Sequence, residues 1–93
     1  MDRLPRPAEI AEAAEDFFGE SVHHDGRASG RRALAKATYW QALNSVGYST
    51  GDIARMTGAH HASVLEALSK AVPLDYVETV LKKAEKMAAS APF

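Results

Sequence analysis

Side chains that can donate or accept hydrogen bonds gather in residues 58–70, which read GAHHASVLEALSK. The imidazole of His61 and the hydroxyl of Ser63 can donate to phosphates or to base edges. The carboxylate of Glu66 can accept a hydrogen bond from the amino group of a cytosine. An ion pair between Glu66 and Lys70, one helical turn later, is an alternative interpretation with at least equal support. These residue types at this spacing favour recognition of nucleic acid.

Catalysis and metal binding have much weaker support in the sequence. The histidines form two adjacent pairs, His23–His24 and His60–His61. Consecutive residues on a helix point about 100° apart, so neither pair forms the i, i+4 face that binds zinc, and a metal ion shared between the pairs is a minor alternative. The sequence has no cysteine, no Walker-type glycine loop, and no serine with a recognisable base or oxyanion loop. We therefore expect no enzymatic activity and no cofactor.

The spacing of small residues predicts how the 58–70 segment is held. Two helices that cross over a turn of three or four residues need a small residue where their backbones approach and a glycine at the turn. Ala54, Gly58 and Val64 meet this need at separations of four and six, which is the spacing of a helix-turn-helix. The remaining apolar positions of the motif are filled by Ile53, Ala59 and Ala67. A purely structural helical hairpin is the alternative interpretation.

If the motif forms, its second helix begins near His60 or His61 and directs its first residues at base edges in the major groove. Thr50, at the start of the preceding helix, can reach a phosphate. Basic residues between 27 and 36 can clamp the backbone or place an arginine in the minor groove. On this geometry six residues of the second helix face the DNA: His60, His61, Ala62, Leu65, Glu66 and Ser69. The full set of candidate DNA-binding residues is Arg27, Arg31, Arg32, Lys36, Thr50, His60, His61, Ala62, Ser63, Glu66 and Lys70.

Helical periodicity without strand-like alternation predicts an all-α fold, a compact bundle of about five helices containing the helix-turn-helix. The expected helices are residues 7–18, residues 31–46, two short helices within 48–68, and a last helix that opens at Leu74. Pro7 and Gly19 fit the first position and the stop of the first helix. Ser49 and Asp52 form a capping pair before the third helix. The expected buried stripe of the second helix is Leu34, Ala37, Trp40 and Leu43.

Charge divides the chain into three parts of a single expected domain, residues 1–93. Residues 1–26, an acidic N-terminal helix and loop, carry a net charge of −5. Residues 27–72, a basic helix followed by the helix-turn-helix, carry +4, and residues 73–93, the C-terminal helix, are neutral. With 46% hydrophobic residues, no cysteine and no long apolar run, the composition predicts a soluble cytoplasmic protein, which we expect to associate with the bacterial nucleoid.

The run GAHHASVLEA, residues 58–67, resembles the C-terminal DNA-binding domain of the replication initiator DnaA, a Trp repressor-like domain in which it reads about G-R-D-H-T-T-V-L-H-A. The resemblance covers roughly residues 27–72 and implies base or phosphate contacts by His61 and Ser63. It also implies that one arginine of the 27–32 stretch enters the minor groove. The matching residues are Gly58, His61, Val64, Leu65 and Ala67, with Ser63 a near match. The departures include Ala59, His60 and Ala62, which replace an arginine, an aspartate and a threonine, and a gap from Ile53 to Gly58 that is one residue shorter than in the family.

These observations predict that the chain binds double-stranded DNA. They favour a transcriptional regulator, an activator rather than a repressor, or the DNA-binding domain of one. The transcriptional activators of gene transfer agents, which are said to carry a DnaA-like domain, are one family that the chain resembles. One alternative is origin binding of the replication-initiator type. The other is a protein-interaction module without DNA binding, in which the acidic first helix or the last helix binds RNA polymerase or another protein. No membrane partner is expected.

Overall fold

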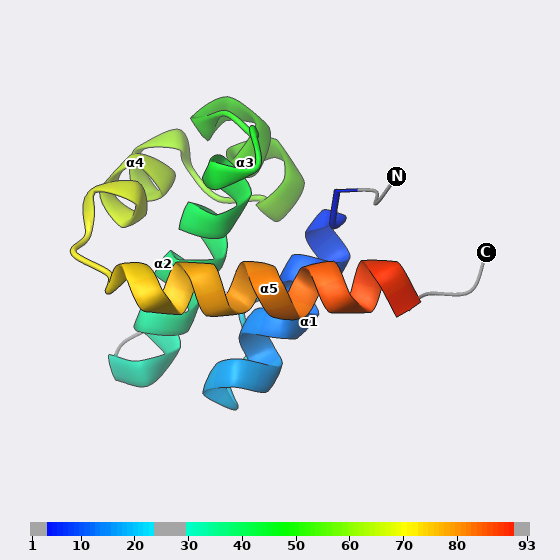
Figure 1. The fold of residues 1–93 in the computed structure, drawn as a ribbon. Helices are drawn as coiled ribbons and strands as arrows, with labels where there is room; N and C mark the ends of the chain where they lie inside the picture. The colour runs from blue at the N-terminus through cyan, green and yellow to red at the C-terminus, as the bar shows by residue number, and fades with distance from the viewer. Residues whose placement is uncertain (1–3, 24–29, 91–93) are drawn as a thin grey trace.

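Five helices make up the part of the chain that the computed structural model describes, residues 4–23 and 30–90 (Figure 1). They are α1 (Pro7–Phe18), α2 (Gly30–Ser45), α3 (Thr50–Thr57), α4 (His61–Ser69) and α5 (Leu74–Ser90). The described residues contain no strand, so the expected all-α bundle of about five helices is confirmed. None of these helices is both long and apolar enough to cross a membrane.

The beginning and end of α1 follow from local chemistry. Pro7 occupies the first helical position, where its missing amide hydrogen is not needed. The carboxylate of Glu9 accepts a hydrogen bond from the N–H of Arg6 at 2.8 Å. At the other end Gly19 adopts φ +70°, and its N–H donates to the carbonyl oxygen of Glu15 at 2.8 Å. Both predicted ends of this helix are confirmed.

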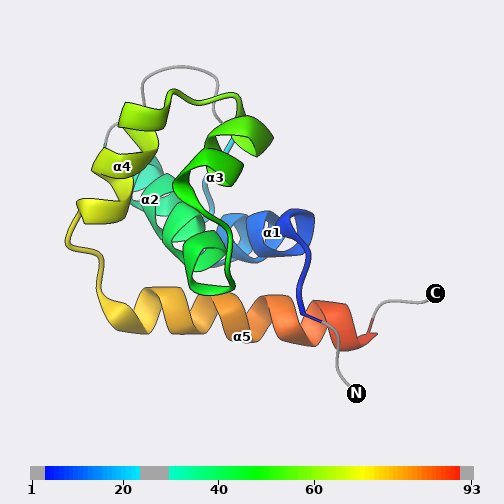
Figure 2. The same ribbon diagram turned by 90° about the horizontal axis from the view of Figure 1, so that it is seen from above.

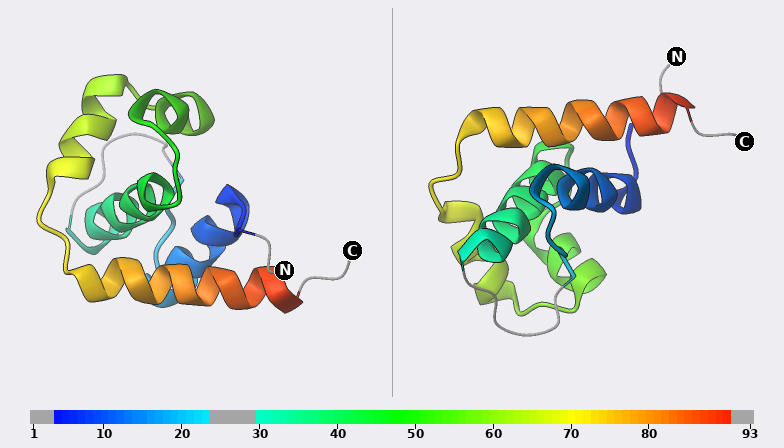
Figure 3. Two further views of the ribbon diagram at one scale, coloured as in Figure 1. Left: turned by 45° about the horizontal axis from the view of Figure 1, so that its top comes forward. Right: turned by 90° about the horizontal axis from the view of Figure 1, so that it is seen from below.

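α2 is the central helix of the bundle. It packs against all four other helices, whereas the backbones of α3 and α4 lie close only to α2 and to one another. Figure 2 shows α2 between the α3–α4 pair and α5, and Figure 3 shows the same arrangement from two further directions. Because helices approach from several sides, α2 is buried on more than the one expected stripe. Its buried apolar residues are Ala35, Ala37, Tyr39, Trp40, Ala42 and Leu43, while Leu34 is half-buried.

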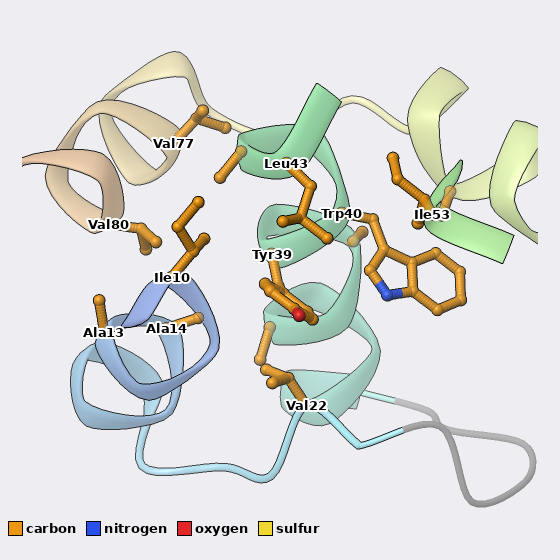
Figure 4. Close-up of a cluster of buried hydrophobic side chains, with 14 of the residues drawn as sticks. Ile10, Ala13, Ala14, Val22, Tyr39, Trp40, Leu43, Ile53, Val77 and Val80 are labelled. Carbon is orange, nitrogen blue, oxygen red and sulfur yellow. The ribbon is translucent and has the colours of Figure 1, made fainter. Parts of the chain in front are cut away.

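The hydrophobic core lies on both sides of α2 (Figure 4). On one side Ile10 of α1 and Val80 of α5 point toward one another, and both are fully buried. On the other side Trp40 points toward Ile53 of α3, which is also fully buried. Removal of this apolar surface from water is the main force that holds the helices together. The α3–α4 pair therefore packs against α2, and α2 in turn packs against α1 and α5.

Aromatic packing fixes α5 against α1. Phe17, Phe18 and Tyr76 form three edge-to-face pairs with ring centroids 4.9 to 5.6 Å apart. At the surface the Nζ of Lys83 lies 3.0 Å from the carboxylate of Asp16. An exposed ion pair of this kind contributes little free energy, so the aromatic cluster is the stronger link.

Candidate nucleic-acid interface

A reciprocal pair of hydrogen bonds sets the start of α3. The N–H of Asp52 donates to the hydroxyl oxygen of Ser49, and the N–H of Ser49 donates to the carboxylate of Asp52, both at 3.1 Å. These bonds from the backbone and side chain of Ser49, with a smaller effect of the nearby Arg55 guanidinium, hold the pKa of Asp52 below its ordinary value. The predicted capping pair is confirmed, and it makes Thr50 the first residue of the helix.

Gly58 ends α3 and opens a three-residue connection to α4. It adopts φ +74°, a left-handed conformation that favours glycine, and its N–H donates to the carbonyl oxygen of Ala54 at 2.9 Å. Ala59 is buried, and His60 is extended and occupies the N-cap position of α4 without a side-chain capping hydrogen bond. The two helices are therefore joined by residues 58–60 alone, as the spacing of Ala54 and Gly58 predicts, and α4 begins at His61.

The inner side of the α3–α4 pair consists of apolar residues. Val64 of α4 is fully buried, as is Ile53 of α3, and Ala54 is half-buried against the same core. All four residues assigned to buried apolar positions by their spacing lie inside, namely Ile53, Ala59, Val64 and Ala67. This burial fixes which side of α4 turns outward.

Gln41 of α2 holds the C-terminal end of α4. Its side-chain amide donates to the carbonyl oxygens of Ala67 at 3.1 Å and Lys70 at 3.0 Å. The last carbonyl groups of a helix have no partner within the helix, so a donor placed there stabilises its end. Sequence reasoning did not single out Gln41, because only the fold brings it to residues so much later in the chain.

The outward residues of α4 form one exposed strip, which we call the α4 surface. At about 100° per residue the exposed positions between 61 and 69 span an arc of roughly 140°. Leu65, at 52% exposure, is the largest apolar side chain in it. The α4 surface consists of His60, His61, Ala62, Leu65, Glu66, Ser69 and Lys70, all of which are exposed. Ser63, also a candidate contact, is half-buried and lies at the edge of this strip.

The ion pair considered for Glu66 and Lys70 is not formed in the described part of the chain. Both side chains are exposed. The backbone carbonyl oxygen of Glu66 accepts a hydrogen bond from the hydroxyl of Ser69 at 2.8 Å, and the Glu66 carboxylate has no partner among the described residues. The carboxylate is therefore open to an external donor.

The two arginines at the start of α2 bind the end of α1 and the segment that follows it. The Nε of Arg31 donates to the carbonyl oxygen of Phe18 at 2.6 Å. The guanidinium of Arg32 donates to the carbonyl oxygens of Ser21 at 3.2 Å and His23 at 3.0 Å. Basic residues at the start of a helix are unfavourably placed against its dipole, and these contacts supply a structural reason for them.

The other basic candidates are not placed alike. Lys36 is only 8% exposed, with its Nζ 5.3 Å from the centroid of the Trp40 ring, a cation–π arrangement. In this conformation Lys36 is not presented to a phosphate, because α2 is covered on several sides. Arg27 lies outside the described residues. Thr50 is half-buried at the start of α3, and Arg55, which sequence reasoning did not single out, is exposed and bound to Asp52.

The described residues contain no group of three side chains that could together hold a metal ion. A hollow of about 290 Å³ lies between α1, residues 22–23, α2 and α3. Tyr39 lines it, and burial raises the pKa of this phenol, with smaller contributions from Glu15 and Tyr48.

The chain matches no protein-family model, no curated protein and no solved structure.

Proposed function

We propose that the chain binds double-stranded DNA through a helix-turn-helix formed by α3 and α4 and acts as a transcriptional regulator. In this proposal α4 is the recognition helix and lies in the major groove. The observation that carries it is the two-sided character of α4. Its inner side is anchored by Val64 and by Gln41 of α2, while its outer side exposes a continuous strip of polar and small residues together with Leu65.

The chemistry of the α4 surface suits base edges. The imidazole of His61 can donate to a purine or to a phosphate, and the side chain of Leu65 can contact the methyl group of a thymine. Ala62, also exposed on the α4 surface, leaves the room that a close approach to the groove requires. Thr50 contributes its hydroxyl to a phosphate at the start of α3.

Arg31 is the strongest candidate for a phosphate contact outside α4. Its Nε is engaged by the carbonyl oxygen of Phe18, which orients the guanidinium, and the side chain belongs to an exposed residue. An arginine has five N–H donors, so one bond to a carbonyl leaves others for a phosphate. An oriented guanidinium loses less conformational freedom on binding than a mobile one.

A protein-interaction module without DNA binding is the second candidate function. The observation that favours it is that Arg31 and Arg32 both bind main-chain carbonyls while Lys36 is buried. In that case the exposed residues of α1 or α5 would contact RNA polymerase or another protein.

Binding of a fluorescently labelled mixed-sequence duplex of about 30 base pairs, followed by anisotropy at several salt concentrations, separates the two candidates. Phosphate contacts release counterions, so DNA binding should weaken at least tenfold between about 50 and 200 mM salt. No binding at low salt and high protein concentration would remove the DNA-binding proposal and leave the protein-interaction module.

A further inference from the structure

We propose that Glu66 is a specificity-determining residue, which lowers the affinity of the α4 surface for DNA in general and selects a cytosine at one position. This inference rests on the proposed function of α4 as the recognition helix. The negative charge of Glu66 opposes DNA binding unless a base donates a hydrogen bond to its carboxylate.

Glu66 has no structural use that would explain its charge. Within residues 4–23 and 30–90, Asp16 is engaged by Lys83 and Asp52 by Arg55. Asp52 also completes the cap of α3. The carboxylate of Glu66 is exposed and has no such partner within residues 4–23 and 30–90. Lys70, the nearest oppositely charged residue along the helix, does not pair with it.

The position of Glu66 places this charge on the α4 surface. It is the only acidic residue between 58 and 70, and the basic part of the chain, residues 27–72, contains just one other acid, Asp52. Its neighbours one turn away are Ala62 and Lys70, both exposed, and the small side chain of Ala62 does not cover it. A helix seated in the major groove by its outer strip would bring this carboxylate to the base edges.

A carboxylate in that place discriminates between bases by charge. Phosphates repel it whatever the sequence, and its removal from water is unfavourable unless a donor replaces the lost hydrogen bonds. In the major groove guanine presents only acceptors, thymine presents an acceptor and a methyl group, and adenine presents its amino group beside an acceptor nitrogen. Cytosine is the only base whose own major-groove edge presents a donor and no acceptor, and the O6 acceptor beside its amino group belongs to the paired guanine. Glu66 should therefore exclude other bases more than it attracts cytosine.

The test compares the parent with Glu66→Gln and with a matched control, Glu78→Gln. Glu78 is an exposed glutamate of α5, a helix whose backbone does not approach α4, and its substitution changes the net charge by the same amount. Each protein is titrated with a mixed-sequence duplex and is used to select binding sites from a randomised duplex library. Circular dichroism establishes that the helical content of the three proteins is the same.

The parent should prefer cytosine at one position of its selected site by about 5-fold or more. Glu66→Gln should bind mixed-sequence DNA several-fold more tightly and lose this preference, or replace it by adenine, which a glutamine amide can bind through two hydrogen bonds. Glu78→Gln should keep the parent's preference and stay within about twofold of its affinity, since it lies away from the α4 surface.

An unchanged base preference in Glu66→Gln, or equal changes of affinity in the two variants, would overturn the role of Glu66 and leave DNA binding itself intact. Failure of all three proteins to bind any duplex at low salt would instead overturn the proposed function, and this inference with it.

Discussion

The side-chain amide of Gln41 in α2 donates a hydrogen bond to the carbonyl oxygen of Lys70, 3.0 Å away, at the end of α4. The same amide also donates to the carbonyl oxygen of Ala67. One polar side chain of the central helix thus fixes the end of the helix that carries the candidate interface. The orientation of the α4 surface depends on this contact as well as on the burial of Val64.

Replacement of Gln41 by Ala should lower the free energy of unfolding by about 1 to 2 kcal/mol, because two carbonyl groups lose their donor. Gln41→Glu should be at least as destabilising, since a carboxylate cannot donate and faces carbonyl oxygens. Urea unfolding measures both effects. Ser45→Ala, an exposed substitution near the end of the same helix, serves as the control. Equal stability of Gln41→Ala and the control would show that the amide does not hold α4.

The cap of α3 should make stability depend on acid pH. The pKa of folded Asp52 is lowered by its bonds with Ser49, so the carboxylate stabilises the fold above its unfolded pKa of about 4. That contribution is lost as the pH falls through the lower, folded pKa. Asp52→Asn should therefore be less stable than the parent at pH 7, and the difference should shrink toward pH 2. A difference that is constant from pH 7 to pH 2 would contradict this role.

Two glycines near one another in the chain should respond oppositely to alanine. Gly58→Ala places a side chain at φ +74° and should destabilise the protein by about 1 kcal/mol. Gly51 has helical backbone, and an added methyl group would meet its nearest neighbour, an Arg55 nitrogen, at 3.7 Å, an ordinary contact. Gly51→Ala should therefore stabilise α3 by up to about 1 kcal/mol. The melting temperatures of the two variants are compared by thermal unfolding. Equal melting temperatures would contradict the requirement for glycine at position 58.

The ends of the helices could be predicted because their determinants are local. Pro7 and Gly19 bracket α1, and Ser49, Asp52 and Gly58 set both ends of α3 through residues within one turn. Neighbours in the sequence suffice for such features. The identity of the exposed side of α4 could also be predicted, because apolar spacing fixes the inner side and leaves the rest outside.

The roles of the polar residues of α2 could not be predicted in the same way. The partners of Arg31 and Arg32 are carbonyl oxygens at the end of α1 and in the segment after it, and the donor role of Gln41 requires the end of α4 to lie beside it. The burial of Lys36 against Trp40 follows from the central place of α2. The positions of basic residues in the sequence show where positive charge lies along a helix. They do not show which sides of that helix are covered by other helices in the fold.

The arginines at the start of α2 should contribute to both stability and DNA binding. The double substitution Arg31→Ala and Arg32→Ala removes the bonds to residues 18–23 and two cations. If both contact phosphates, the slope of log affinity against log salt should decrease in magnitude by about 2. The matched control is Lys82→Ala with Lys86→Ala, which removes two exposed cations of α5. Equal salt slopes for the parent and the arginine variant would rule out the phosphate clamp, whatever the change in stability.

Nuclear magnetic resonance tests the central claim most directly, because it reports the binding surface residue by residue. ¹⁵N-labelled protein is titrated with a short mixed-sequence duplex at low salt, and amide shifts are followed in heteronuclear correlation spectra. DNA recognition by α4 predicts that the largest changes fall between residues 60 and 70 and at the start of α3, with little change along α5. Changes concentrated in α1 or α5, with the amides of α4 unmoved, would contradict it.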